Sequence, residues 1–65
     1  MPSQAEVEAA LKGKAIEGKV KAEDVLACVG SLGVSSDAVN NYLKDHKDAE
    51  GKVDLSGVVT FISSL

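Results

Sequence analysis

The sequence contains no arginine and no tryptophan, and Tyr42 and Phe61 are its only aromatic residues. Nucleic-acid-binding proteins usually present a basic patch in which arginine is prominent. Here all the basic residues are lysines, the net charge is −3, and the lysines are mixed with Asp and Glu. We therefore expect no nucleic-acid partner. With so few aromatic residues, the core must be built mainly from Val, Leu, Ile and Ala.

Cysteine is also scarce, because Cys28 is the only one. A single cysteine excludes an internal disulfide and fits a reducing compartment, where it would serve as a small buried apolar residue. No apolar run approaches the roughly 20 residues that span a bilayer. The first residues lack the charged and apolar regions of a secretory signal. We expect a soluble cytoplasmic protein that inserts into no membrane.

A sequence repeat is the most informative feature that is present. The tetrapeptide Glu-Gly-Lys-Val occupies residues 17–20 and again residues 50–53. Aligning residues 14–32 with residues 47–65, an offset of 33, gives eight identities in nineteen positions. Upstream, at an offset of 32, a second match pairs Val7, Ala10 and Leu11 with Val39, Tyr42 and Leu43. The chain is one unit built twice, over about 4–33 and 35–65. Ankyrin and tetratricopeptide arrays have similar periods but need about three copies.

Each copy contains two stretches with helical periodicity. Apolar residues spaced i, i+3, i+4 predict a helix over about 4–12, which Ser3 would cap and Gly13 would weaken. A second helix should begin at Ala22, with Val25, Leu26, Cys28, Val29 and Leu32 on its apolar side and Gly33 as its C-cap. Ser35 or Ser36 should cap a third helix that ends near His46, and Ser56 a fourth that reaches Leu65. An all-α fold of four short helices is predicted.

The two glycine-centred loops resemble the EF-hand motif. In that motif a glycine at loop position 6 makes a sharp turn, and an aliphatic residue two places later pairs with its twin. The pairs Gly18 with Val20 and Gly51 with Val53 have this spacing. Residues 29–33 and 53–62 are similar to the "MRSLG" and "IDFPEFLTMM" segments of calmodulin and myosin light chains. The resemblance implies a single EF-hand pair over residues 1–65, with a minimal bridge between the loops.

The loops depart from the pattern at the positions that bind calcium. Six to eight oxygen ligands are normally required, anchored by positions 1 and 12. Aligned on its glycine, the second loop would offer His46, Asp48, Glu50, the Lys52 carbonyl, Asp54 and Gly57. The first would offer Gly13, Ala15, Glu17, the Lys19 carbonyl, Lys21 and Asp24. We expect no metal and no cofactor, the alternative being a weak residual site at Asp48, Glu50 and Asp54.

Cys28 and His46 are the only residues that could suggest a catalytic thiol–imidazole pair. No third orienting residue, glycine-bounded nucleophile or oxyanion arrangement accompanies it. We expect a structural role for both residues and no enzymatic activity.

The other function of an EF-hand pair, besides binding calcium, is to hold an amphipathic helix in the groove between its helices. The resemblance extends to the single-lobe light chains of amoeboid class I myosins, which implies a calcium-independent clasp on the IQ motif of a myosin lever arm. The residues expected to line the groove are Leu11, Val25, Cys28, Val29, Leu32, Tyr42, Val58, Phe61, Ile62 and Leu65. The alternatives are a closed core without a partner, a non-motor adaptor that binds another helix or a second copy, and a calcium binder.

Overall fold

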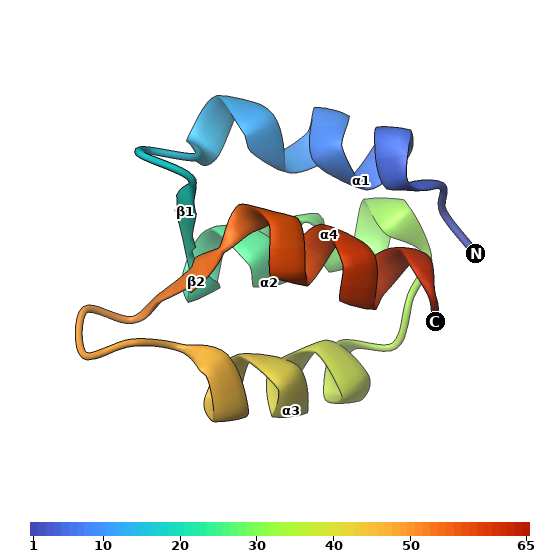
Figure 1. Cartoon of the computed structure of the whole chain (residues 1–65). Helices are drawn as coiled ribbons and strands as arrows, with labels where there is room; N and C mark the ends of the chain where they lie inside the picture. Colours follow the sequence, from blue (N-terminus) through green and yellow to red (C-terminus); the bar gives the residue numbers. More distant parts are fainter.

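The computed structural model describes all residues from Met1 to Leu65 and is mostly helical (Figure 1). In chain order the elements are α1 (Gln4–Leu11), the 3-10 turn η1 (Lys12–Lys14), β1 (Lys19–Lys21), α2 (Ala22–Leu32), α3 (Ser36–His46), β2 (Lys52–Asp54) and α4 (Leu55–Ser63). The chain therefore forms four helices, as their periodicity predicted, and one small antiparallel sheet, as the EF-hand resemblance implied.

Local capping fixes several of the helix ends. The Ser3 hydroxyl accepts from the Glu6 amide at 3.1 Å, and the Glu6 carboxylate accepts from the Ser3 amide at 3.0 Å, which completes a capping box. Ser35 caps α3 by accepting from the Ala38 amide. Gly33 ends α2 with a φ of 69°, in the left-handed region that glycine tolerates best. The caps at Ser3 and Gly33 were predicted from the sequence, and Ser35 was one of the two residues predicted for α3.

The end of α1 agrees with the predicted range of about 4–12, because its α-helical part ends at Leu11 and the chain tightens into η1 around Gly13. Two predictions about α4 are wrong. This helix ends at Ser63 and does not reach Leu65. The predicted cap at Ser56 is wrong, because α4 begins at Leu55 directly after β2 and Ser56 lies within its first turn. Asp54 precedes the helix without a side-chain capping bond.

The strands β1 and β2 pair antiparallel and join the two copies of the repeat. Val20 lies opposite Val53, as predicted, and both side chains are buried. On either side of the sheet, the Gly18 carbonyl accepts from the Leu55 amide at 2.8 Å and the Gly51 carbonyl accepts from the Ala22 amide at 2.9 Å. Each turn therefore satisfies the first free amide of the helix in the other copy.

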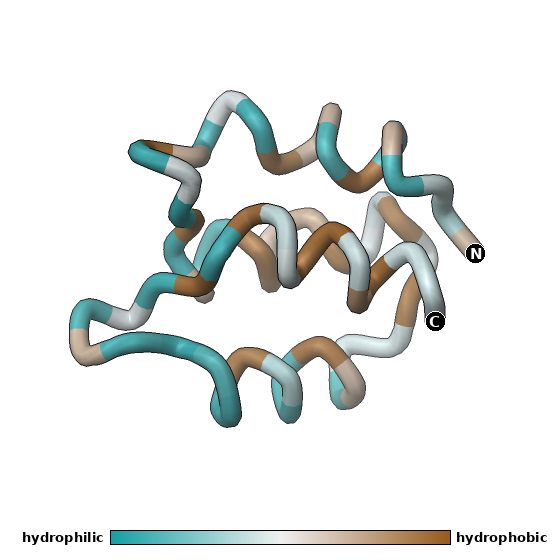
Figure 2. The backbone as a smooth tube through the Cα atoms, in the orientation of Figure 1, coloured by the Kyte–Doolittle hydropathy of each residue, from teal (hydrophilic) through white to brown (hydrophobic).

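The core lies between the helices. Eleven apolar residues are buried, and eight of them are valines. α1 packs against α4 and α2, and α2 packs against α3. Figure 2 shows the apolar segments of α1 and α3 on the sides that face α4. Leu26 was predicted on the apolar side of its helix, but it is 39% exposed and lies outside this core.

None of the helices combines the length and the apolar character that crossing a bilayer requires.

Candidate partner surface and loop end

The residues that were predicted to line a groove fall into two sets. The first set lies in the core: Leu11, Val25, Val58 and Ile62 are fully buried, and Val29 is 4% exposed. These side chains fill the space between the helices, and no pocket opens there. In this closed arrangement a partner helix could reach them only if the helices moved apart.

The second set is partly accessible, and we call its members the rim residues: Cys28, Leu32, Tyr42, Phe61 and Leu65. The first four pack against the core while keeping some exposed surface, and Leu65 is 37% exposed. Because α2 and α4 each begin at the sheet and run away from it, Leu32 and Leu65 lie at the end of the molecule opposite the loops (Figure 1). The rim residues are the part of the predicted set that a partner can contact directly.

An aromatic stack holds part of this rim together. The Tyr42 ring stacks on Phe61 of α4 with centroids 4.4 Å apart, and on His46 of its own helix at 4.0 Å. The Nδ1 atom of His46 lies 2.9 Å from the Tyr42 carbonyl, one turn earlier. Burial and the charge of Asp54 raise the pKa of Tyr42, so its phenol stays neutral at physiological pH. The stack links α3 to α4 with apolar faces turned partly to solvent.

The single cysteine is held as a neutral thiol. Cys28 Sγ donates to the Val25 carbonyl at 3.2 Å, and burial raises the pKa of the thiol. A nucleophilic cysteine requires the opposite shift, toward the thiolate. His46 forms its hydrogen bond within α3, and no hydrogen bond joins it to Cys28.

At the loop end, backbone groups occupy the carbonyls that a calcium-binding loop would offer at position 7. The Lys19 carbonyl accepts from the Ile16 amide at 2.9 Å, and the Lys52 carbonyl accepts from the Asp48 amide at 2.8 Å. Glu17 and Gly18 both have positive φ, as in the two-residue turns of β-hairpins. The first loop is thus a tight hairpin turn closed on itself.

Asp48 organises the second loop. Its Oδ1 atom accepts from the amides of Glu50 and Lys52, at 2.8 and 3.0 Å. Its Oδ2 atom accepts from Lys19 Nζ at 3.0 Å. The Lys52 amide, then the Lys19 ammonium and the Glu50 amide, lower the pKa of Asp48 to about 2. Both oxygens of this carboxylate are therefore engaged within the chain.

The Lys19 ammonium lies between acids of the other copy. It is 3.0 Å from Asp48 Oδ2 and 3.8 Å from Asp54 Oδ1, and these acids raise its pKa. No three His, Cys, Asp or Glu side chains gather in a geometry that could hold a metal ion. The residues considered as a weak metal site, Asp48, Glu50 and Asp54, are each paired with a lysine instead.

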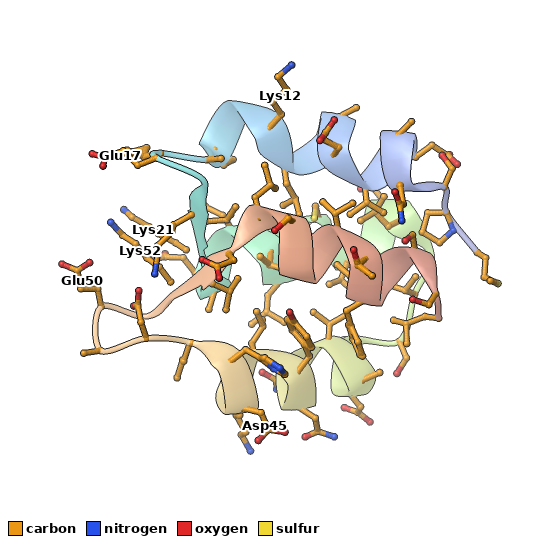
Figure 3. The ribbon with its side chains drawn as sticks, in the orientation of Figure 1. Lys12, Glu17, Lys21, Asp45, Glu50 and Lys52 are labelled. Carbon is orange, nitrogen blue, oxygen red and sulfur yellow. The ribbon has the colours of Figure 1, made fainter.

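The role of the Lys19 side chain was not predicted, although the sequence contains a signal for it. Once Val20 is paired with Val53, the register places Lys19 opposite Asp54 and Lys21 opposite Lys52. Figure 3 shows Lys21 and Lys52 projecting from the sheet toward the same side, with Glu17 and Glu50 at the two turns. The contact with Asp48, 29 residues away, depends on the turn of the second loop and could not be read from the register alone.

Charge is divided unevenly between the loops and the helices. Six of the seven lysines lie in residues 12–21 and 47–54, together with four acids. The rest of the chain carries one lysine, Lys44, and six acids, which are Glu6, Glu8, Glu23, Asp24, Asp37 and Asp45. The helical body that bears the rim residues is therefore acidic.

Comparison of the chain with protein-family profiles, with curated proteins and with solved structures found no match.

Proposed function

We propose that the chain is a single EF-hand-type pair that acts as a calcium-independent light chain in the cytoplasm and clasps the IQ-motif helix of a class I myosin lever arm. Such a motif is a basic amphipathic helix, so its recognition requires an apolar surface within an acidic field. The observation that carries the proposal is the combination of partly exposed rim residues with a helical body of six acids and one lysine. No catalytic step and no cofactor is part of the proposed function.

The loop geometry supports independence from calcium. In an EF-hand pair that responds to calcium, the ion reorients the helices by drawing loop oxygens together. Here the Lys19 and Lys52 carbonyls and the Asp48 carboxylate are already bonded within the chain. Each turn also holds the start of a helix in the other copy, because the carbonyls of Gly18 and Gly51 accept from the first amides of α4 and α2.

The closed core defines what the partner helix must do. Rim residues such as Phe61 and Leu32 make the first contacts, and acidic side chains attract the basic face of the helix. Separation of the helices then exposes Val29 and Ile62, which lie one turn or less from the rim residues along α2 and α4. Apolar burial supplies the main part of the binding free energy.

Calorimetry with a synthetic IQ-type peptide tests this proposal. In the presence of chelator the full chain should bind with a negative heat-capacity change, and added salt should weaken the binding. A control peptide whose basic residues are replaced by glutamine should bind much more weakly. Millimolar calcium should change neither the affinity nor the amide spectrum.

Three outcomes would contradict the proposal. If a panel of lever-arm IQ peptides shows no binding at low salt, the chain is not a myosin light chain. If other basic amphipathic helices bind while IQ peptides do not, the chain is a non-motor adaptor. Saturable spectral shifts at Gly18 or Gly51 with micromolar calcium would instead indicate a calcium binder.

A further inference from the structure

At the outer face of the sheet, a lysine of the first copy of the repeat forms ion pairs with two acids of the second copy. Lys19 belongs to the first copy, whereas the carboxylates within 4 Å of its ammonium, those of Asp48 and Asp54, belong to the second. The strand register fixes the Lys19 backbone opposite Asp54. A cation from one loop therefore lies among the acids of the other.

Hydrogen bonds within its own turn hold Asp48 in place independently of Lys19. One of its oxygens accepts two backbone amides, and its main chain closes the turn through bonds to Lys52 and Gly51. An exposed ion pair usually contributes little, because two long side chains must be ordered to form it. Here one partner is already ordered by the turn and the other extends from a paired strand, so the entropic cost is reduced.

We propose that Lys19 is a tethered cation that ties the two loops together, in the place where a calcium-dependent pair would rely on a bound ion. This inference rests on the proposed EF-hand-type pair and deepens it, because it names the residue that holds the loops in place without calcium. Losing the Lys19 charge leaves Asp48 and Asp54 without their shared counterion and loosens the second turn. The order of the loops then depends on ionic strength and on the charge state of Lys19 rather than on calcium.

Amide hydrogen exchange of the full chain, measured by NMR in chelator, tests the proposal at the amides of Glu50 and Lys52. Lys19→Met removes the charge and keeps an apolar stem. Lys21→Met is the matched control, because Lys21 lies on the same strand and forms no ion pair. We expect Lys19→Met to speed exchange at both amides by about threefold or more at low salt, through local opening of the turn. Lys21→Met should leave both rates unchanged.

Two further variants separate the effect of the ion pair from the effect of the hydrogen bonds that close the turn. Asp48→Asn keeps an oxygen that can accept the Glu50 and Lys52 amides but removes the negative charge. Adding Lys19→Met to it should therefore speed exchange much less than in the wild type, because only the longer contact with Asp54 remains to be lost. Lys19→Arg keeps the charge and should retain slow exchange. High salt, about 1 M, should reduce the difference between the wild type and Lys19→Met because it screens exposed charges.

The proposal is overturned if Lys19→Met and Lys21→Met behave alike, or if the effect of Lys19→Met persists in full in the Asp48→Asn background. Peptide binding takes no part in this measurement. A chain that binds no IQ peptide but shows the expected exchange pattern would refute the proposed function and leave the tethered cation in place.

Discussion

At the residue scale, a partly exposed polar side chain forms the hydrogen bonds that close one of the two turns. Asp48 closes the second turn through its backbone and side chain and also accepts from Lys19. The first turn is closed by the backbone alone, with Glu17 at a φ of 53° beside Gly18. A non-glycine residue in this left-handed region is uncommon, and Asn-Gly is the usual pair in such turns. Glu-Gly in the repeat correctly indicated a turn, but the sequence did not reveal that the two copies would close their turns differently.

The lowered pKa of Asp48 predicts how the stability of the chain depends on acid. Its pKa is about 2 in the folded chain against an ordinary value of 3.8, so the folded state binds fewer protons between these values. The stability from this group is complete above about pH 4 and is lost as the pH falls toward 2. Thermal melts followed by circular dichroism should show the wild type losing stability in this window.

Asp48→Asn should lose less stability than the wild type over the same range. The Asp48→Asn variant should still lose some stability in acid, because the Ser3 amide and hydroxyl lower the pKa of Glu6 as well. Asp45→Asn, a change at an exposed carboxylate outside the ion pairs, should follow the wild type. An Asp48→Asn curve parallel to that of the wild type would contradict the assigned role of the Asp48 carboxylate.

At the element scale, the helix starts show where local sequence is sufficient and where it is not. α1 and α3 begin directly after Ser3 and Ser35, whose hydroxyls accept nearby amides. Ser3 was predicted as a cap, and Ser35 was one of the two candidates for α3. α2 and α4 begin directly after the strands, without a side-chain capping bond. Their first amides donate to Gly51 and Gly18 of the other copy instead. A bond between distant segments leaves no local signal, which is why Ser56 was wrongly predicted as a cap.

Two helical glycines should respond oppositely to alanine. A Cβ at Gly30 meets no atom within 4 Å, so Gly30→Ala should stabilise the chain by about 0.5–1 kcal/mol through helix propensity. A Cβ at Gly57 would lie 2.8 Å from the Tyr42 hydroxyl oxygen. That ring is stacked on both His46 and Phe61, so it cannot move away without disturbing the stack.

We therefore expect Gly57→Ala to bring no gain in stability or a net loss, measured by urea unfolding. Adding Tyr42→Phe removes the hydroxyl and should recover the propensity gain relative to Tyr42→Phe alone. If Gly57→Ala stabilises the chain as much as Gly30→Ala does, the contact between α3 and α4 at Tyr42 is looser than described.

At the scale of the whole molecule, the repeat predicted the architecture better than it predicted the surface. Identical spacing in the two copies was enough to place four helices, and the resemblance to the EF-hand motif added the pairing of Val20 with Val53. Periodicity could not divide the predicted groove residues into buried and accessible ones, because that division depends on how closely the helices pack. Val29 and Leu32 lie on one face of α2, yet only Val29 belongs to the buried core.

The core itself is small and stiff. Eight valines, two leucines and one isoleucine make up its buried residues, with no aromatic among them. Valine has few accessible rotamers, so this core adapts less readily to different partners than one built from flexible side chains. The composition agrees with a chain that has few targets, as the proposed function requires.

The division between core and rim leads to a prediction that separates folding from binding. Phe61 and Leu32 retain exposed surface, and interface energy usually concentrates in a few large apolar anchors. Phe61→Ala and Leu32→Ala should each weaken IQ-peptide binding by about 1–3 kcal/mol, and by more than they lower the stability of the free chain.

Val53→Ala should do the reverse, because Val53 is 1% exposed and pairs with Val20 beneath the sheet. We expect it to cost about 1–3 kcal/mol of stability and to leave the affinity of the folded chain nearly unchanged. Leu26→Ala, at an exposed leucine outside the predicted groove, is the control that should alter neither quantity much. Thermal melts run beside calorimetry at a temperature where every variant is folded separate the two effects. Unfolding of the free chain by Phe61→Ala would place Phe61 among the residues that the fold itself requires, and the rim on α4 would then have no role in the clasp.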